Sequence, residues 1–118
     1  MREIFHLVEP DLWHRDPDQP YRPDSLRTEG FIHCSNADQV ARVANLFYRD
    51  RPALLVLRID ADRLGPLLRD EDAGTGEKFP HLYTPLDRGT VLDVFPLVRG
   101  PDGDWIFPAT REARQDGQ

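Results

Sequence analysis

Long apolar runs and paired cysteines are both missing from this chain of 118 residues. No apolar stretch approaches the roughly 20 residues that a membrane-spanning helix needs, so we expect no membrane partner. The single cysteine, Cys34, cannot form an intrachain disulfide, which is typical of a reducing compartment. The first residues enter a strand pattern and lack the layout of a signal peptide. We therefore expect a cytoplasmic protein.

The short motifs that usually reveal a chemistry are absent as well. There is no G-x-G-x-x-G, no G-x-x-x-x-G-K-[ST], no H-E-x-x-H and no C-x-x-C. Residues 74–78 (Gly-Thr-Gly-Glu-Lys) resemble a phosphate loop only superficially, because the spacing differs. The net charge of −6, from 15 basic and 21 acidic residues, disfavours binding to a nucleic-acid backbone. The acidic balance does not exclude a local basic pocket.

Eleven prolines divide the chain into short elements and argue against a helical bundle. Apolar and alternating patterns predict strands over 2–8, 31–34, 53–59, 79–83, 91–97 and 105–107, with another beginning near Leu67. Short helices are predicted after Glu9 and over 24–29, and the clearest helix follows Ser35. That helix has an apolar stripe of Val40, Val43, Ala44 and Phe47.

Strands and long helices do not alternate, so a doubly wound parallel sheet is not expected. We predict an α+β fold: one compact domain over residues 1–110 with a bent or split, mainly antiparallel sheet and short helices. Residues 111–118 form a polar C-terminal tail. The glycine- and acid-rich segment 70–78 is predicted to be a mobile surface loop. Residues 79–83 are predicted to be a short strand or an extended edge, because Pro80 suits an edge or the first positions of a strand.

Three of the four histidines, His6, His33 and His81, lie inside these apolar strand segments. A half-buried strand favours Val, Ile, Phe or Tyr at such positions. An imidazole there needs hydrogen-bond partners, and leaving it unpaired costs roughly 1–3 kcal/mol. We therefore predict that the three histidines open into one polar cleft.

Several readings of this cleft are open. A catalytic zinc takes three protein ligands, but positions 6, 33 and 81 include no close pair, so no metal is expected. Cys34 alternates away from His33 on a strand, which favours a buried, unreactive thiol over a nucleophile. Ser35 shares a face with His33, or it is the N-cap of the following helix, a position that Asn36 also suits. Tyr83 shares a face with His81, and the alternative is an edge pair with its polar tips in water.

Several segments in the right order carry a resemblance to a known family. They are Phe5-His6, then Glu29 to Ser35 (Glu-Gly-Phe-Ile-His-Cys-Ser) with the helix through Val40 and Ala44, then Glu71 to Gly74 and Phe79 to Tyr83 (Phe-Pro-His-Leu-Tyr). Over about residues 4–97 the chain resembles the bacterial domain-of-unknown-function family 952. That family in turn looks like a compact member of the ADP-ribosyltransferase fold superfamily.

The superfamily resemblance implies NAD as the cofactor or ligand, held across a split sheet. It implies cofactor-binding roles for His6, which would grip the ribose, and for His33, Ser35 and Tyr83. Either Glu71 or His81 would act at the reacting carbon, in ADP-ribose transfer or NAD hydrolysis. No residue matches the superfamily's glutamate motif. The alternative is therefore a non-catalytic ligand-binding or protein-interaction module on the same fold.

Overall fold

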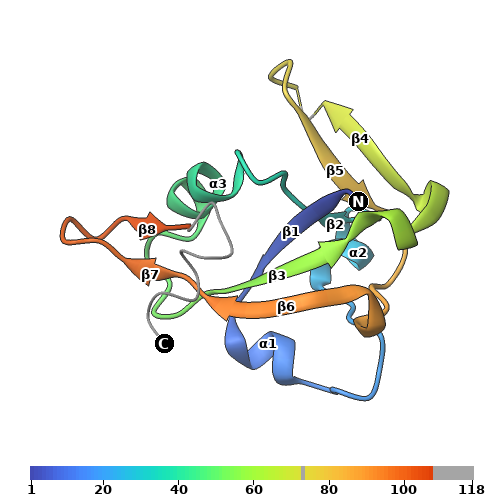
Figure 1. Ribbon diagram of the computed structural model, residues 1–118, viewed down its shortest axis with the longest axis horizontal. Helices are drawn as coiled ribbons and strands as arrows, with labels where there is room; N and C mark the ends of the chain where they lie inside the picture. Colours follow the sequence, from blue (N-terminus) through green and yellow to red (C-terminus); the bar gives the residue numbers. More distant parts are fainter. Residues whose placement is uncertain (73, 108–118) are drawn as a thin grey trace.

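The computed structural model describes residues 1–72 and 74–107, and in it two separate antiparallel sheets form the body of the protein (Figure 1). The first sheet has the order β1-β3-β6, from strands β1 (Glu3–Val8), β3 (Leu55–Asp60) and β6 (Val91–Pro96). The second has the order β2-β5-β4, from strands β2 (Ile32–His33), β5 (Lys78–Leu82) and β4 (Leu68–Asp72). A small hairpin joins β7 (Val98–Arg99) to β8 (Trp105–Ile106). The predicted small α+β domain with antiparallel sheets is confirmed.

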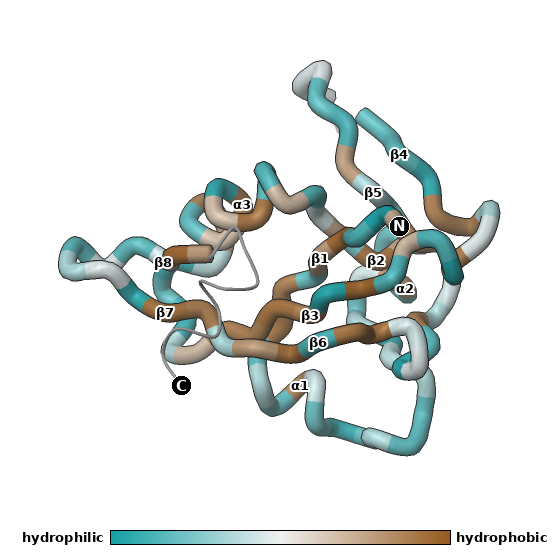
Figure 2. The backbone as a smooth tube through the Cα atoms, in the orientation of Figure 1, coloured by the Kyte–Doolittle hydropathy of each residue, from teal (hydrophilic) through white to brown (hydrophobic). Residues whose placement is uncertain are grey.

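Figure 2 shows mostly hydrophobic residues along β1, β3 and β6 of the first sheet. One face of β1 and β3 packs against the second sheet, with Ile4, Leu57 and Ile59 beside Ile32 and Leu82. The other face packs under a helix and the small hairpin, in a cluster that includes Phe5, Leu7, Val56, Val40, Ala44 and Trp105. This two-sided burial explains why the segment ending at Ile59 is almost continuously apolar, and it confirms its central place.

In the described part of the chain, three α-helices lie beside the sheets: α1 (Pro10–His14), α2 (Asp24–Thr28) and α3 (Val40–Phe47). Pro10 begins α1, where its missing N–H costs nothing, and Gly30 closes α2 with a φ of +91°. The Asn45 side chain on α3 bonds the backbone of Trp105 twice, at 2.7 and 3.0 Å, and so ties α3 to β8. Within the predicted apolar stripe Val40 and Ala44 are buried, but Phe47 is 69% exposed. Phe47 is the last residue of the helix and lines a cavity, so the stripe does not face the core along its whole length.

The second sheet corrects two sequence-based expectations. Residues 70–78 are not a mobile loop as a whole, because β4 extends to Asp72 and β5 begins at Lys78. β5 is the middle strand of its sheet, not an edge. Pro80 is accommodated because its carbonyl accepts a hydrogen bond from the Cys34 N–H (3.0 Å), one residue beyond the end of β2. The position at which Pro80 lacks an N–H is therefore the end of the hydrogen-bond ladder between β2 and β5.

The two sheets are joined at Ser35. Its backbone N–H and carbonyl exchange hydrogen bonds with Phe5 on β1, at 2.7 and 2.8 Å. Ser35 and Asn36 are therefore not the N-cap of α3, which begins at Val40 after Gln39. The pairing with β1 outweighs the local capping preference. The predicted C-terminal tail, 111–118, lies outside the described residues.

Candidate functional site

A cavity of about 860 Å³ lies between α3 and the β4–β5 hairpin. Its wall continues over β1, α1 and α2 and is mostly apolar, with charged side chains at a few places. Among the predicted site residues, those on the wall are His6, His33, Ser35 and His81. The predicted convergence of the three histidines is therefore found. Glu71 and Tyr83 do not line the cavity but bond to each other beside His81.

His6 is buried, and both of its ring nitrogens are bonded within the protein. Nδ1 lies 2.6 Å from the carbonyl oxygen of His33, which can only accept, so Nδ1 carries the proton. The Tyr21 hydroxyl then donates to Nε2 at 2.9 Å. Burial lowers the pKa of His6 to about 4, so the ring is neutral. His6 has no ring nitrogen left for a ligand and instead fixes Tyr21 at the cavity wall.

Tyr21 is a site residue that the sequence reasoning missed. It is 5% exposed, and its ring packs edge-on against Trp13 at 5.6 Å between centroids. Burial raises the pKa of its hydroxyl, which therefore stays protonated. The available signal was an aromatic residue between Pro20 and Pro23, outside every predicted helix and strand.

His33 and His81 lie side by side on β2 and β5, at directly paired positions. Their rings are 5.6 Å apart and nearly perpendicular. His33 is the more exposed, and its Nε2 lies 3.0 Å from a carboxylate oxygen of Glu29 at the end of α2. His81 is 6% exposed, and its Nδ1 lies 3.0 Å from Oε1 of Glu71. Within the described residues Nε2 of His81 has no hydrogen-bond partner, and it is not sealed from solvent.

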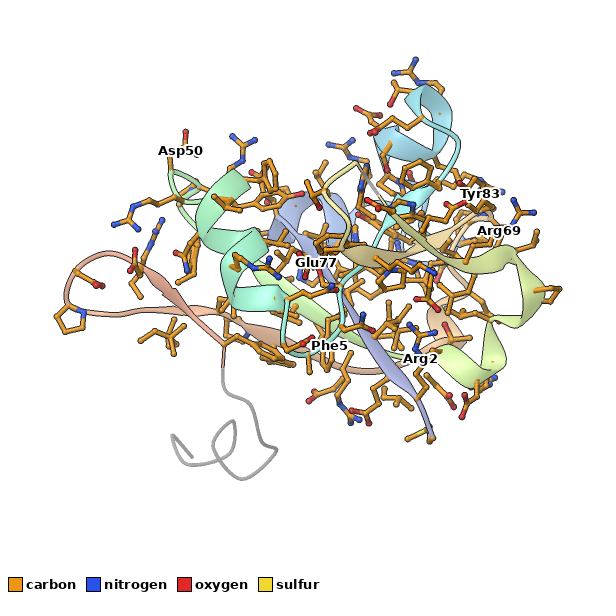
Figure 3. All side chains as sticks on the ribbon, turned by 90° about the horizontal axis from the view of Figure 1, so that it is seen from above. Arg2, Phe5, Asp50, Arg69, Glu77 and Tyr83 are labelled. Carbon is orange, nitrogen blue, oxygen red and sulfur yellow. The ribbon has the colours of Figure 1, made fainter. Side chains whose placement is uncertain are left out.

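Glu71 fixes the orientation of His81. The Tyr83 hydroxyl donates to the same Oε1 at 2.5 Å, and this bond and the one from His81 lower the pKa of Glu71. Phe31 stacks on the His81 ring at 4.0 Å, and Arg69 lies over the Tyr83 ring at 4.8 Å. Figure 3 shows Arg69 and Tyr83 side by side at this end of the second sheet. A carboxylate on one imidazole nitrogen leaves the other in position to accept or donate a proton.

The hydroxyl and thiol next to His33 differ in environment. Ser35 is 5% exposed and lines the cavity, held by its backbone pairing with Phe5. Cys34 is 4% exposed; it also borders the cavity, but its side chain belongs to the core between the sheets. Burial raises the pKa of its thiol to about 12, so thiolate chemistry at neutral pH is not supported.

Ion pairs hold the cavity's rim. Glu77 at the tip of the β4–β5 hairpin forms two bonds with Arg42 of α3, at 2.6 and 2.7 Å, and accepts another from Gln39 at 3.0 Å. The bonds from Arg42 and Gln39 lower the pKa of Glu77 to about 2. In Figure 3 Glu77 lies beside α3, although it belongs to the hairpin. Arg51 pairs with Glu9 at 3.3 Å, and both of these residues also line the cavity.

The described residues include no cluster of three or more His, Cys, Asp or Glu side chains arranged to hold a metal ion. They also include no helix long and apolar enough to cross a membrane.

Comparison with known proteins identifies a family and solved relatives. The model of the family described as "Protein of unknown function (DUF952)" matches residues 7–94. The chain belongs to this family. Among solved structures, the crystal structure of CC0527 from Caulobacter crescentus is similar, with 28% identity and a TM-score of 0.81 over 88% of this chain and 93% of that chain. The solution NMR structure of CC0527 has 28% identity and a TM-score of 0.77 over 88% and 91% of the two chains. A search of curated proteins finds no match.

Proposed function

We propose that this DUF952 protein binds NAD or a related nucleotide in the cavity, and that it transfers ADP-ribose or hydrolyses NAD. The observation that carries the proposal is His81: its ring is fixed by Glu71 on one side and has a free nitrogen on the other, on the wall of a cavity of about 860 Å³. That volume is within the roughly 300–1,000 Å³ of small-molecule sites. The split antiparallel sheet is compatible with an ADP-ribosyltransferase-like fold, which is part of the proposal.

The residues divide into binding and proton-transfer roles. The hydroxyls of Ser35 and Tyr21 and the His33 ring line the cavity as donors or acceptors for ribose hydroxyls. Nε2 of His81 accepts the proton of the attacking water or acceptor hydroxyl. The oxygen bonds to C1′ of the ribose while the C1′–N bond breaks, and nicotinamide leaves with the electron pair as a neutral molecule. Glu71 and Tyr83 act as positioning residues through His81, because they do not line the cavity.

A non-catalytic interaction module on the same fold is the second candidate. It is favoured by two large apolar side chains at the cavity's rim, Leu46 and Phe47, which are 68% and 69% exposed. Exposed apolar side chains grouped beside a cavity are typical of surfaces that a partner covers. Under this reading the cavity has no reaction to perform, and His81 is a structural residue.

Calorimetric titration with NAD, ADP-ribose and nicotinamide tests binding, and nicotinamide release from NAD tests turnover. We expect the parent protein to bind NAD, and His81→Gln to bind it with similar affinity but to release at least about tenfold less nicotinamide. Glu71→Gln should lower turnover with little change in KM, because its effect passes through His81. His14→Gln is the matched control, since His14 is exposed on α1 away from the cavity wall.

The outcomes separate the two candidates. No binding of NAD at millimolar concentration removes the nucleotide proposal. Binding without nicotinamide release favours the non-catalytic module. His6→Ala should also weaken NAD binding more than His14→Ala, because it releases the Tyr21 hydroxyl. One lost hydrogen bond of this kind weakens binding roughly two- to tenfold.

A further inference from the structure

Among the residues that the structure describes, the wall of the large cavity has no unpaired guanidinium to offer a phosphate group. Its two arginines are both in ion pairs, Arg42 with Glu77 and Arg51 with Glu9. His6 is neutral, because burial lowers its pKa to about 4. A diphosphate carries negative charge that is costly to bury without cationic or donor partners. The diphosphate of a nucleotide seated in this cavity therefore needs a different place.

A second cavity, of about 260 Å³, adjoins the first. The two share three wall residues, which are Leu12, Tyr21 and Pro23. The second cavity is more basic than acidic, with three arginines against two aspartates: Arg15, Arg22 and Arg88 against Asp16 and Asp24. In a chain of net charge −6 this is a local excess of positive charge.

The three arginines are not equivalent. The Arg88 guanidinium donates to the backbone carbonyls of the preceding loop, those of Trp13, Arg15, Asp16 and Gln19, at 2.6 to 3.4 Å. It also lies over the Trp13 ring at 4.2 Å, so its role is structural. The side chains of Arg15 and Arg22, by contrast, have no ion pair or hydrogen bond within the described residues.

Both free arginines are attached to a fixed backbone. The carbonyl of Arg15 accepts from Arg88 at 3.2 Å. Tyr21, which precedes Arg22, exchanges two backbone hydrogen bonds with Leu86, each of 2.9 Å. A side chain on an anchored backbone has less freedom to lose when it binds. Arginine also matches phosphate oxygens with two parallel N–H donors.

We infer that Arg15 and Arg22 form a diphosphate subsite for the nucleotide whose ribose occupies the large cavity, with Tyr21 at the boundary between the two. The inference rests on the proposed nucleotide binding and names the part of the chain that receives the phosphates. Asp16 and Asp24 lie on the same wall, and their negative charges weaken the attraction of the subsite for phosphate. The subsite therefore contributes only moderately to the affinity for the nucleotide. The nucleoside end of the ligand then occupies the cavity whose arginines are already paired.

The test uses the full chain and two probes. Inorganic pyrophosphate is titrated into ¹⁵N-labelled protein, and the amide signals of Arg15 and Arg22 are followed by NMR. We expect these signals to shift, and the shift to disappear in the double variant Arg15→Gln/Arg22→Gln. Arg27→Gln is the matched control, because Arg27 is exposed on α2 and lines neither cavity. Thermal unfolding confirms that each variant is folded.

NAD and nicotinamide riboside are then titrated by calorimetry. The double variant should bind NAD about tenfold more weakly than the parent, because each contact between an exposed arginine and a phosphate contributes about two- to fivefold. The affinity for nicotinamide riboside, which has no phosphate, should not change. Pyrophosphate that shifts no signal near Arg15 and Arg22, or NAD bound equally by the parent and the double variant, overturns the subsite. Pyrophosphate bound at these residues without any NAD binding supports the subsite and removes the NAD proposal, so the two failures are distinguishable.

Discussion

Mild acid should destabilise this fold through one of its buried histidines, His6. His6 is 7% exposed, donates from Nδ1 and accepts the Tyr21 hydroxyl at Nε2. Protonating Nε2 removes that acceptor and places a charge in the core. Burial accordingly lowers the pKa of His6 to about 4, against an ordinary value of 6.5. Since one pKa unit corresponds to about 1.4 kcal/mol, the full effect is of the order of 3 kcal/mol.

The direction of the effect follows from proton uptake. The unfolded chain protonates this imidazole near pH 6.5, whereas the folded protein does so only near pH 4. Between these values the unfolded state holds more protons, so the free energy of unfolding falls as the pH falls. The contribution of the neutral His6 ring to the free energy of unfolding is complete above pH 6.5 and is lost by pH 4. Asp70, Glu71, Asp72 and Glu77 have lowered pKa values, so their contribution is lost only as the pH falls below the ordinary carboxylate range.

Urea unfolding at pH 7.5 and pH 4.5 measures the effect. The parent protein should lose about 2 kcal/mol more than His6→Gln between these pH values, because glutamine does not titrate. An NMR titration of the His6 ring in the native parent checks the same point without a variant. Equal losses in the two proteins, or a His6 midpoint near 6.5 in the folded state, would refute the reasoning.

Further predictions concern the loop clamp, the rim and the thiol. Arg88→Ala should lower the free energy of unfolding by about 2 kcal/mol in urea, because it frees several carbonyls and the Trp13 ring; an unchanged midpoint contradicts this. Arg42→Ala should speed amide hydrogen exchange around Glu77 but not in β3, and exchange that is unchanged at the hairpin tip counts against the rim's role. Native Cys34 should react with a thiol reagent only as fast as the protein opens, and immediate labelling contradicts its burial.

The strands of the first sheet could be predicted from the sequence because buried strands are rich in apolar residues. The segment ending at Ile59 is apolar at nearly every position, as a strand covered on both faces must be. β4 could not be predicted to its end in the same way, since its residues after Leu68 are all charged. Those residues form a strand because β5 supplies the hydrogen bonds, and within the described residues the other side of β4 has no neighbouring strand. The composition of this segment therefore predicts a loop, whereas pairing with β5 makes it a strand.

The site was predictable in part for a related reason. Imidazoles in apolar strands need partners, and this requirement led to the common cleft of His6, His33 and His81. The partners themselves were not predictable, because Tyr21 and Glu29 lie on a loop and at a helix end whose positions depend on the whole fold. The competing roles of Ser35 were also settled at long range, by its backbone bonds to Phe5.

The three histidines share one cavity wall, but their hydrogen bonds differ. His6 uses both nitrogens within the protein, and His33 has its ring half exposed with one carboxylate partner. Only His81 combines a ring held by stacking and a carboxylate with a free nitrogen at a cavity wall. A proton-transfer group needs both features, because a bonded nitrogen cannot react and a mobile ring is seldom in position. Any reaction in this cavity should therefore depend on His81 most directly, on Glu71 through His81, and on His6 only through Tyr21.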